Sequence, residues 1–209
     1  MTKLLYIQAS PRGDASRSIA VADAYLAALG ASTPGLEVDT IELWNAGLPE
    51  FDGNRVNAKM TVFGGGTNEG RHATLWDEIT TIAQRFITAD RYLFAIPMWN
   101  NGIPYKLKQY IDLIHQPGLT FGFSPETGYF GLLEGKKATL VYTSGAFSQA
   151  FPSPAFGVDH QSTYMDSWLD QAGVTEREVI RYQPTILTTD SDGDLARAKA
   201  AAAALGARP

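Results

Sequence analysis

Short apolar runs alternate along the chain with segments whose apolar residues recur every three or four positions. Three of the runs are apolar over most of their length, which is typical of strands covered on both faces of a sheet. The pattern predicts five strands, at Lys3–Ala9, Glu37–Leu43, Tyr92–Pro97, Ala138–Thr143 and Val179–Pro184.

The segments between these runs predict five helices. Their apolar positions are Ala22–Leu29 before a stop at Gly30, Leu75–Phe86, Leu107–Ile114 after Pro104, Met165–Ala172 before Gly173, and the alanine-rich Leu195–Leu205. Strict alternation of strand and helix predicts one α/β domain over residues 1–209, a doubly wound five-stranded parallel sheet of order 2-1-3-4-5 with helices on both faces.

Two long excursions interrupt this alternation, at Trp44–Gly70 and Gln116–Lys136. Both are rich in glycine, proline, asparagine and aromatic residues and are expected to be loops. Loops of this length inside a domain are usually functional or interfacial.

Composition excludes several classes of protein. The net charge of −5 means that the chain lacks the excess of positive charge that attracts nucleic acid or an anionic membrane. No apolar run approaches the ~20 residues of a membrane span, and the N-terminus lacks the features of a signal peptide. The absence of cysteine excludes disulfides and thiolate chemistry. These properties favour a cytoplasmic location.

The first loop with distinctive chemistry runs from Ser10 to Ser18, between the first strand and the first helix. A helix N-terminus offers free backbone N–H groups and a positive dipole end, and Ser10, Ser16, Ser18, Arg12 and Arg17 add hydroxyl donors and charge. This combination predicts a phosphate site. The alternative is a plain N-cap by Ser16 or Asp14. The loop matches neither G-x-G-x-x-G nor G-x-x-x-x-G-K-[ST], which disfavours a dinucleotide or nucleoside triphosphate site.

Two further loops follow the third and fourth strands at the same edge of the sheet. Pro97–Asn101 offers Met98, Trp99 for stacking, and Asn100 and Asn101 for hydrogen bonding, although it is also explained as a rigid connector. Ser144–Phe147 combines Gly145, which permits close approach of the backbone, with Ala146 and Phe147, a ring able to close over a planar ligand. One phosphate loop and two ring loops predict a mononucleotide site, and flavin mononucleotide (FMN) fits it best.

With these loops, the chain resembles the FMN-dependent NADH azoreductases and the related flavodoxin-like NAD(P)H quinone reductases. The resemblance covers most of the chain and rests on blocks that follow in the family's order and spacing. These blocks are Ser10 with Ser16–Ser18, Pro97–Asn100, Leu107–Asp112, Gly118–Phe121, Gly131–Lys137 and Ser144–Gly145.

The resemblance implies that Ser10 and Ser16–Ser18 hold the FMN phosphate, and that Met98–Asn101 and Ser144–Phe147 hold the isoalloxazine. It also implies a homodimer whose active sites lie at the interface, where aromatic residues of the long loops, here Phe121, Phe123 and Tyr129, cover the flavin. The chain departs from the family at Asn101, where phenylalanine is common, and at Ala146–Phe147, where two glycines are frequent.

The resulting hypothesis is an FMN oxidoreductase that takes hydride from NADH through flavin N5 and passes electrons to a quinone or azo compound in a ping-pong cycle. One alternative is a flavodoxin-like electron carrier without enzymatic activity. A second is a ligand-sensing or structural protein with a degenerate site, which would be colourless.

No side chain is required as a nucleophile in this hypothesis. His115 is a candidate proton donor, or else a helix C-terminal histidine favoured by the dipole, and His160 is a candidate for a pocket built by a dimer. No metal site is expected. The three histidines are too far apart in sequence for a local zinc motif. The Asp190–Asp194 segment resembles the start of a calcium-binding loop, but the twelfth position of that loop, which requires glutamate, is Ala201. The chain also lacks a G-x-S-x-G elbow, which disfavours a serine hydrolase.

Overall fold

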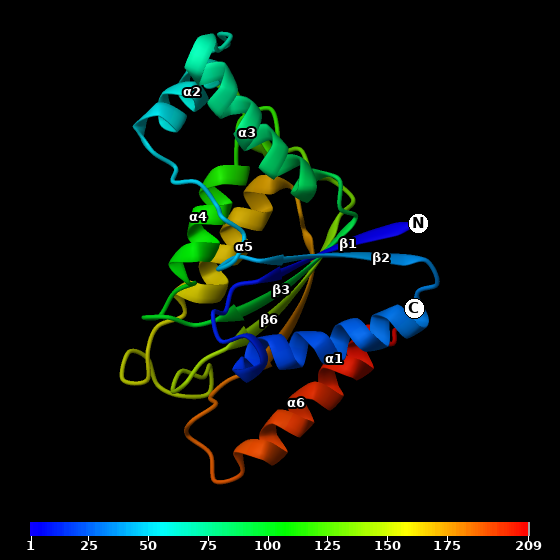
Figure 1. The fold of residues 1–209 in the computed structure, drawn as a ribbon. Helices are drawn as coiled ribbons and strands as arrows, with labels where there is room; N and C mark the ends of the chain where they lie inside the picture. The colour runs from blue at the N-terminus through cyan, green and yellow to red at the C-terminus, as the bar shows by residue number, and fades with distance from the viewer. Residues whose placement is uncertain (209) are drawn as a thin grey trace.

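The computed structural model describes residues 1–208 and contains a five-stranded sheet in which all neighbouring strands are parallel. Its strand order is β2-β1-β3-β6-β7, which confirms the predicted order 2-1-3-4-5 (Figure 1). The strands are β1 (Thr2–Gln8), β2 (Leu36–Glu42), β3 (Arg91–Pro97), β6 (Lys137–Thr143) and β7 (Glu176–Tyr182).

Helices cover both faces of this sheet. One face carries α1 (Arg17–Ser32) and α6 (Ser191–Gly206), and the other carries α3 (Gly70–Ile87), α4 (Tyr105–Ile114) and α5 (His160–Ala172) (Figure 1). The central strands alternate their side chains between two hydrophobic layers. Leu5 and Phe94 enter the layer beneath α3, α4 and α5, whereas Leu4 and Leu93 enter the layer beneath α1 and α6. No helix within residues 1–208 is long and apolar enough to cross a membrane.

The first four strands lie within one residue of their predicted bounds, and larger differences are found for the first helix and the last strand. The first helix does not stop at Gly30 but continues to Ser32, because Gly30 lies on the exposed side of α1, where a missing side chain costs no packing. The last strand begins at Glu176 rather than Val179 and ends before Pro184. As an edge strand that pairs only with β6, β7 tolerates charged residues that a buried strand would exclude. Gly173, by contrast, ends α5 as predicted, with the left-handed φ of 92°.

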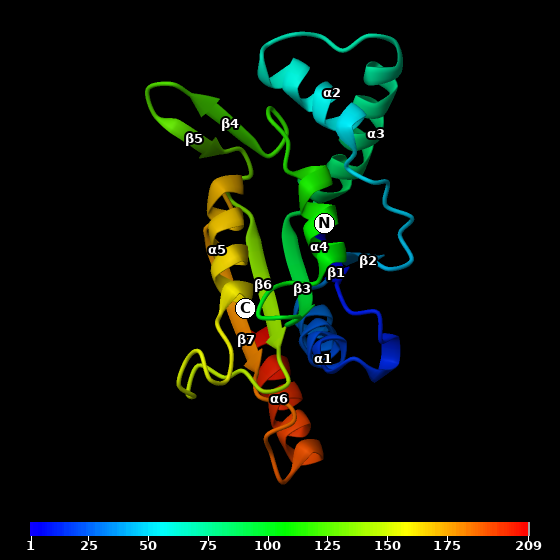
Figure 2. The same cartoon turned by 90° about the vertical axis from the view of Figure 1, so that its left-hand side faces the viewer.

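Both excursions contain regular structure that the sequence pattern did not predict. The first holds α2 (Gly53–Phe63), which is capped by the Asp52 side chain. The second holds a hairpin of β4 (Phe121–Ser124) and β5 (Gly128–Gly131), which lies at the C-terminal end of α5 (Figure 2). At that end the hairpin and helix touch through glycines, because a Cβ on Gly131 would lie 2.1 Å from the backbone nitrogen of Gly173.

Candidate functional site

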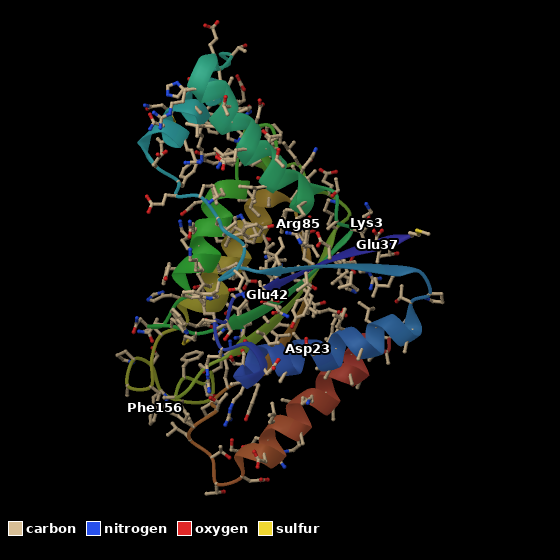
Figure 3. The ribbon with its side chains drawn as sticks, viewed as in Figure 1. Lys3, Asp23, Glu37, Glu42, Arg85 and Phe156 are labelled. Atoms are coloured by element: carbon tan, nitrogen blue, oxygen red, sulfur yellow. The ribbon has the colours of Figure 1, made fainter. Side chains whose placement is uncertain are left out.

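A cavity of about 330 Å³ opens at the carboxyl edge of the sheet, where the topology predicts ligand binding. The loops after β1, β3, β6 and β7 all contribute to its wall. The residues that line it are Ser10, Pro11, Arg12, Ser16, Arg17, Pro97, Met98, Trp99, Thr143, Ser144, Gly145, Thr185 and Ile186. The charged groups labelled Lys3, Glu37 and Arg85 in Figure 3 mark the opposite edge, where the strands begin.

The N-terminus of α1 forms one end of this cavity. Ser16 is the N-cap, and its hydroxyl accepts a hydrogen bond from the Ile19 N–H at 3.4 Å and lies 3.1 Å from the Ser18 hydroxyl. Ser10, Ser16 and Ser18 are all buried. The backbone N–H groups of Arg17 and Ser18 have no acceptor within residues 1–208. The Ser10 and Ser16 hydroxyls, the free N–H groups and the helix dipole therefore meet at this end of the cavity, as an anion requires, whereas Ser18 does not line it.

The charge at this end of the cavity is positive and uncompensated. Arg12 and Arg17 line the cavity, and no aspartate or glutamate among the described residues does so. The Arg17 guanidinium is fixed by donating to the Tyr182 hydroxyl at 2.7 Å, the Thr185 carbonyl at 3.0 Å and the Ser191 hydroxyl at 2.6 Å. Arg17 thus ties α1 to the loop after β7, and its charge acts on the cavity from a fixed position.

The loop after β3 contributes Pro97, Met98 and Trp99 to the cavity, but not Asn100 or Asn101. Trp99 and Gly102 exchange backbone hydrogen bonds of 2.9 Å around the two asparagines, whose φ angles are 48° and 70°. Positive φ at both central residues is the geometry of a type I′ turn, for which asparagine is well suited. The N–H groups of Met98 and Trp99 are already bonded within the protein, so in this turn only those of Asn100 and Asn101 remain free among the described contacts.

Asn101 points away from the cavity and binds another loop. Its side-chain oxygen accepts the N–H of Val158 at 3.1 Å, and its carbonyl accepts the N–H of His160 at 3.0 Å. Asn101 therefore links the loop after β3 to the segment that precedes α5, and its contact with a planar ligand stays a prediction.

The loop after β6 contributes Ser144 and Gly145 to the cavity, whereas Ala146 and Phe147 do not line it. Phe147 is only 7% exposed, and its carbonyl accepts a hydrogen bond from the Ser144 hydroxyl at 2.5 Å. Its ring is therefore packed inside the protein rather than placed to close over a ligand. The backbone N–H groups of Gly145–Phe147 have no acceptor in the described part of the chain and are free to bind one.

Thr185 and Ile186 form a fourth wall that the sequence reasoning missed. The N–H of Thr185 lies 2.9 Å from the carbonyls of both Ser144 and Gly145, and that of Ile186 donates to Gly145 at 3.1 Å. Ile186 is 68% exposed, which is unusual for an aliphatic side chain at the rim of a cavity. The sequence did indicate this wall, because Ile186 follows the fifth strand and the carboxyl ends of all parallel strands in this sheet lie at the same edge.

Comparison with known proteins fits this geometry. The family model described as "Flavodoxin-like fold" matches residues 2–205. A protein of Ruegeria pomeroyi named FMN-dependent NADH:quinone oxidoreductase is 48% identical over 201 residues, which are 96% of this chain and 98% of that protein. One of the same name from Desulfotalea psychrophila is 44% identical over 191 residues, which are 91% and 88% of the two chains. The chain belongs to this family of flavodoxin-like oxidoreductases.

Solved structures show the same fold. An azoreductase from Bacillus anthracis strain Sterne superimposes with a TM-score of 0.87 at 24% identity and covers 99% of both chains. An FMN-dependent NADH-azoreductase from the Ames Ancestor strain, solved in complex with FMN, gives a TM-score of 0.83 at 25% identity over 99% of this chain and all of that one.

The aromatic residues that the family resemblance assigns to a substrate pocket do not lie at the cavity of the same chain. Phe121, Phe123 and Tyr129 belong to the β4–β5 hairpin, at the C-terminal end of α5. The loop after β6, which lines the cavity, leads into the other end of this helix, so the 13 residues of α5 separate the two sites by roughly 20 Å (Figure 2). Phe123 is 47% and Tyr129 55% exposed, whereas Phe121 is only 4% exposed and packs against His115, so its ring is not free to cover a ligand as the resemblance implies.

The two candidate histidines also lie outside the cavity. His160 begins α5 and lines a broad hollow of about 640 Å³ between α4 and α5, together with Gly102, Ile103, Tyr105, Lys108, Thr163, Tyr164 and Ser167. His115 follows the last residue of α4, far from the loop after β3 where that helix begins.

The surroundings of His115 explain its protonation state. One ring nitrogen lies 3.0 Å from the Gln171 side-chain oxygen and the other 3.1 Å from the Thr120 hydroxyl, and the ring packs against Phe121. Burial lowers the pKa of His115 to about 4, an effect only partly opposed by the Gln171 hydrogen bond. His115 is therefore neutral at physiological pH, and attraction of an imidazolium to the helix dipole does not explain its position. Among the described residues there is also no group of three His, Asp or Glu that could hold a metal ion.

Proposed function

We propose that the protein is an FMN-dependent oxidoreductase that uses NADH to reduce quinones and azo compounds. The observation that carries this proposal is the two-ended cavity. One end combines buried hydroxyls, free N–H groups and two arginines, and the other presents Met98, Trp99 and Ile186. The names of the relatives from Ruegeria pomeroyi and Desulfotalea psychrophila point to the same activity.

The residues present fit the phosphate of FMN. A phosphate dianion requires several donors and compensating charge, and the α1 N-terminus supplies free N–H groups of Arg17 and Ser18 beside the Ser10 and Ser16 hydroxyls that line the cavity. No acidic residue occupies the first turn of α1 or lines the cavity. The fixed Arg17 guanidinium has no carboxylate among its hydrogen-bond partners, so its charge is available to an anion in the cavity.

The residues present also fit a flat heterocycle with polar edges. Gly145 lines the cavity with a free N–H group, and the free N–H groups of Asn100, Asn101, Ala146 and Phe147 follow directly after lining residues of the loops that end neighbouring strands β3 and β6. Donors aimed at one ring edge would favour the state in which that edge carries negative charge. Gly145 leaves room for this approach, because the nearest atom to a Cβ built on it is a methyl of Ile186 at 3.4 Å.

The chemistry that FMN supplies when bound is acceptance of hydride at N5 from NADH and delivery of two electrons to a quinone or azo compound in a second half-reaction. The task of the chain is to hold the phosphate, orient the ring and leave one face open to two successive partners. Exposed Ile186 and Trp99 lie on the rim where these partners would enter. No acid–base side chain is assigned, because the neutral His115 lies outside the cavity.

A homodimer with the active site at its interface is part of this proposal. The hairpin carries three exposed aromatic side chains, Phe123, Tyr129 and Phe130, which a single chain leaves remote from its own cavity. A second copy could bring these rings over the flavin, which would give exposed apolar side chains a partner. A cytoplasmic enzyme would meet NADH at the required concentration, and we propose that location as well.

The experiment is direct. The purified protein should show the visible absorbance of bound oxidised FMN, lose it on anaerobic mixing with NADH, and regain it on addition of a quinone. Colourless protein that does not take up added FMN would refute the flavin site. Protein that binds FMN but is not bleached by NADH would instead indicate an electron carrier of the flavodoxin type.

A further inference from the structure

Three aromatic side chains meet beside the cavity, and two of them, Trp44 and Tyr105, have no role in the site described above. Trp44 comes from the segment after β2, Trp99 from the loop after β3, and Tyr105 from the first position of α4. The Trp44 ring lies 5.5 Å from Trp99 and 5.1 Å from Tyr105, and the last two are 6.3 Å apart. Of the three, only Trp99 lines the cavity.

Trp44 touches both loops that form the two ends of the cavity. Its indole N–H donates to the carbonyl of Ala9 at 3.0 Å, and Ala9 is the buried residue directly before Ser10 of the phosphate loop. Its ring packs at an angle of 47° against Trp99, in the wall beside the proposed isoalloxazine. A single side chain therefore links the phosphate end to the ring end.

Trp44 is itself held firmly enough to act in this way. Leu43, the residue before it, is 1% exposed and donates its N–H to the Gln8 carbonyl at 3.1 Å. A few residues later, the Gln109 side chain of α4 donates to the carbonyls of Leu48 and Pro49 at 3.2 and 2.9 Å. The first part of the Trp44–Gly70 excursion is thus fixed to the sheet and to α4 on both sides of the indole.

Trp99 needs such support because its backbone turn does not fix its ring. The turn holds the Trp99 backbone through two bonds to Gly102, yet the side chain is 36% exposed. Its aromatic neighbours in the described chain are Trp44 and Tyr105, and Tyr105 is 60% exposed. Trp44 is therefore the neighbour with a fixed position against which the Trp99 ring can rest.

We propose that Trp44 is a positioning residue of the flavin cavity. It sets the orientation of the Trp99 side chain against the isoalloxazine ring and the position of the Ala9 carbonyl before the phosphate loop. Trp44 thereby keeps the distance between the phosphate end and the ring end of the cavity constant. The inference rests on the proposed FMN site, but it concerns a residue outside the cavity that acts through two residues at its wall.

The test measures the binding of FMN and of riboflavin to apo-protein by quenching of flavin fluorescence, with thermal unfolding as the check on folding. Trp44→Phe keeps a ring against Trp99 but removes the N–H, and should weaken FMN about 3- to 10-fold, as expected for one lost hydrogen bond. Trp44→Leu removes the ring as well and should weaken both flavins by about a further 3- to 10-fold.

Tyr105→Leu is the matched control, because it removes another ring of the same cluster without touching Ala9. It should change FMN affinity by less than about 2-fold, given its exposure. Equal losses for Tyr105→Leu and Trp44→Leu would overturn the proposal, since they would mean that any ring of the cluster serves equally.

A double-mutant cycle separates positioning from general stability. If Trp44 acts through Trp99, the loss that Trp44→Leu adds to Trp44→Phe should largely disappear in a Trp99→Leu background. The midpoint potential of the bound flavin should follow the same pattern, a readout that overall stability would not move. Full additivity of the two substitutions, or unchanged affinity in both Trp44 variants, would overturn the inference. Failure of the wild-type apo-protein to bind FMN would instead overturn the proposed function.

Discussion

Ser16→Asp is the sharpest single test of the phosphate end of the cavity. Ser16 combines two roles, since its hydroxyl caps α1 by accepting the Ile19 N–H and its side chain lines the cavity. Aspartate is as good an N-cap as serine, and its charge suits a helix N-terminus. The substitution should therefore keep α1 intact while it adds a negative charge where a phosphate is proposed to bind.

The expected size of the effect follows from Coulomb's law. Two unit charges about 4 Å apart repel by ~1 kcal/mol in bulk water and by ~4 kcal/mol at the effective dielectric near a protein surface. The cavity is open to solvent, so we take the lower half of this range and double it for a dianion. A penalty of about 2 to 5 kcal/mol results, which corresponds to about 30- to 5000-fold weaker FMN binding.

The assay is titration of apo-protein with FMN and, in parallel, with riboflavin, which has the ring but no phosphate. Ser16→Asn is the matched variant, because asparagine also caps helices and has nearly the shape of aspartate without its charge. FMN affinity should fall steeply for Ser16→Asp and only modestly for Ser16→Asn, while riboflavin affinity stays close to that of the wild type in both. Equal FMN affinities in the two variants, or an equal loss of riboflavin, would show that the phosphate does not lie at α1.

Three further predictions concern the fold and its pH dependence. Gly30→Ala should raise the unfolding free energy by about 0.5 to 1 kcal/mol in urea denaturation, because Gly30 is exposed inside α1 with open space around a Cβ; a loss of stability would contradict this. Gly131→Ala should lower it by about 3 kcal/mol or more, because the new Cβ would lie 2.1 Å from the Gly173 backbone, which cannot rotate away; a neutral result would mean that hairpin and helix separate easily. The pKa of His115 is lowered from 6.5 to about 4 by folding. The contribution of neutral His115 to the unfolding free energy is therefore fully present above pH 6.5 and is lost as the pH falls toward 4. Between pH 6.5 and pH 4 the unfolding free energy of the wild type should fall by up to about 3 kcal/mol more than that of His115→Gln, as measured by denaturation at several pH values. Parallel pH profiles of the two proteins would contradict the assigned burial of the ring.

The sheet was predictable from the sequence because its signals are local and strong. The runs that became β1, β3 and β6 are almost wholly apolar, and in the structure they are buried on both faces. Once their order is known, the carboxyl edge and its loops follow from chain direction alone. This is why the prediction placed Ser10, Ser16, Trp99, Ser144 and their neighbours at one cavity without knowing a single contact.

The excursions were not predictable by the same reasoning, because their elements are stabilised by contacts with distant segments. Among the residues of α2 only Ala58 is buried, so its sequence carries little apolar periodicity. The hairpin depends on Gly131 resting against Gly173, which lies 42 positions later. Trp44 illustrates the same limit: nothing nearby in the sequence indicates that its N–H binds the Ala9 carbonyl, 35 positions earlier.

Asn101 is held by the same kind of distant contact. The turn requires φ values of 48° and 70° at Asn100 and Asn101, which asparagine adopts more readily than a bulky residue. The Asn101 side chain then holds the Val158 N–H, and a Cβ on Gly157 would lie only 2.7 Å from its oxygen. The loop after β3 and the segment before α5 are therefore fitted to one another through Asn101 and Gly157. The same segment follows the loop of Gly145 in the chain, so Asn101 connects the loop after β3 to the segment that leads from the second ring loop into α5.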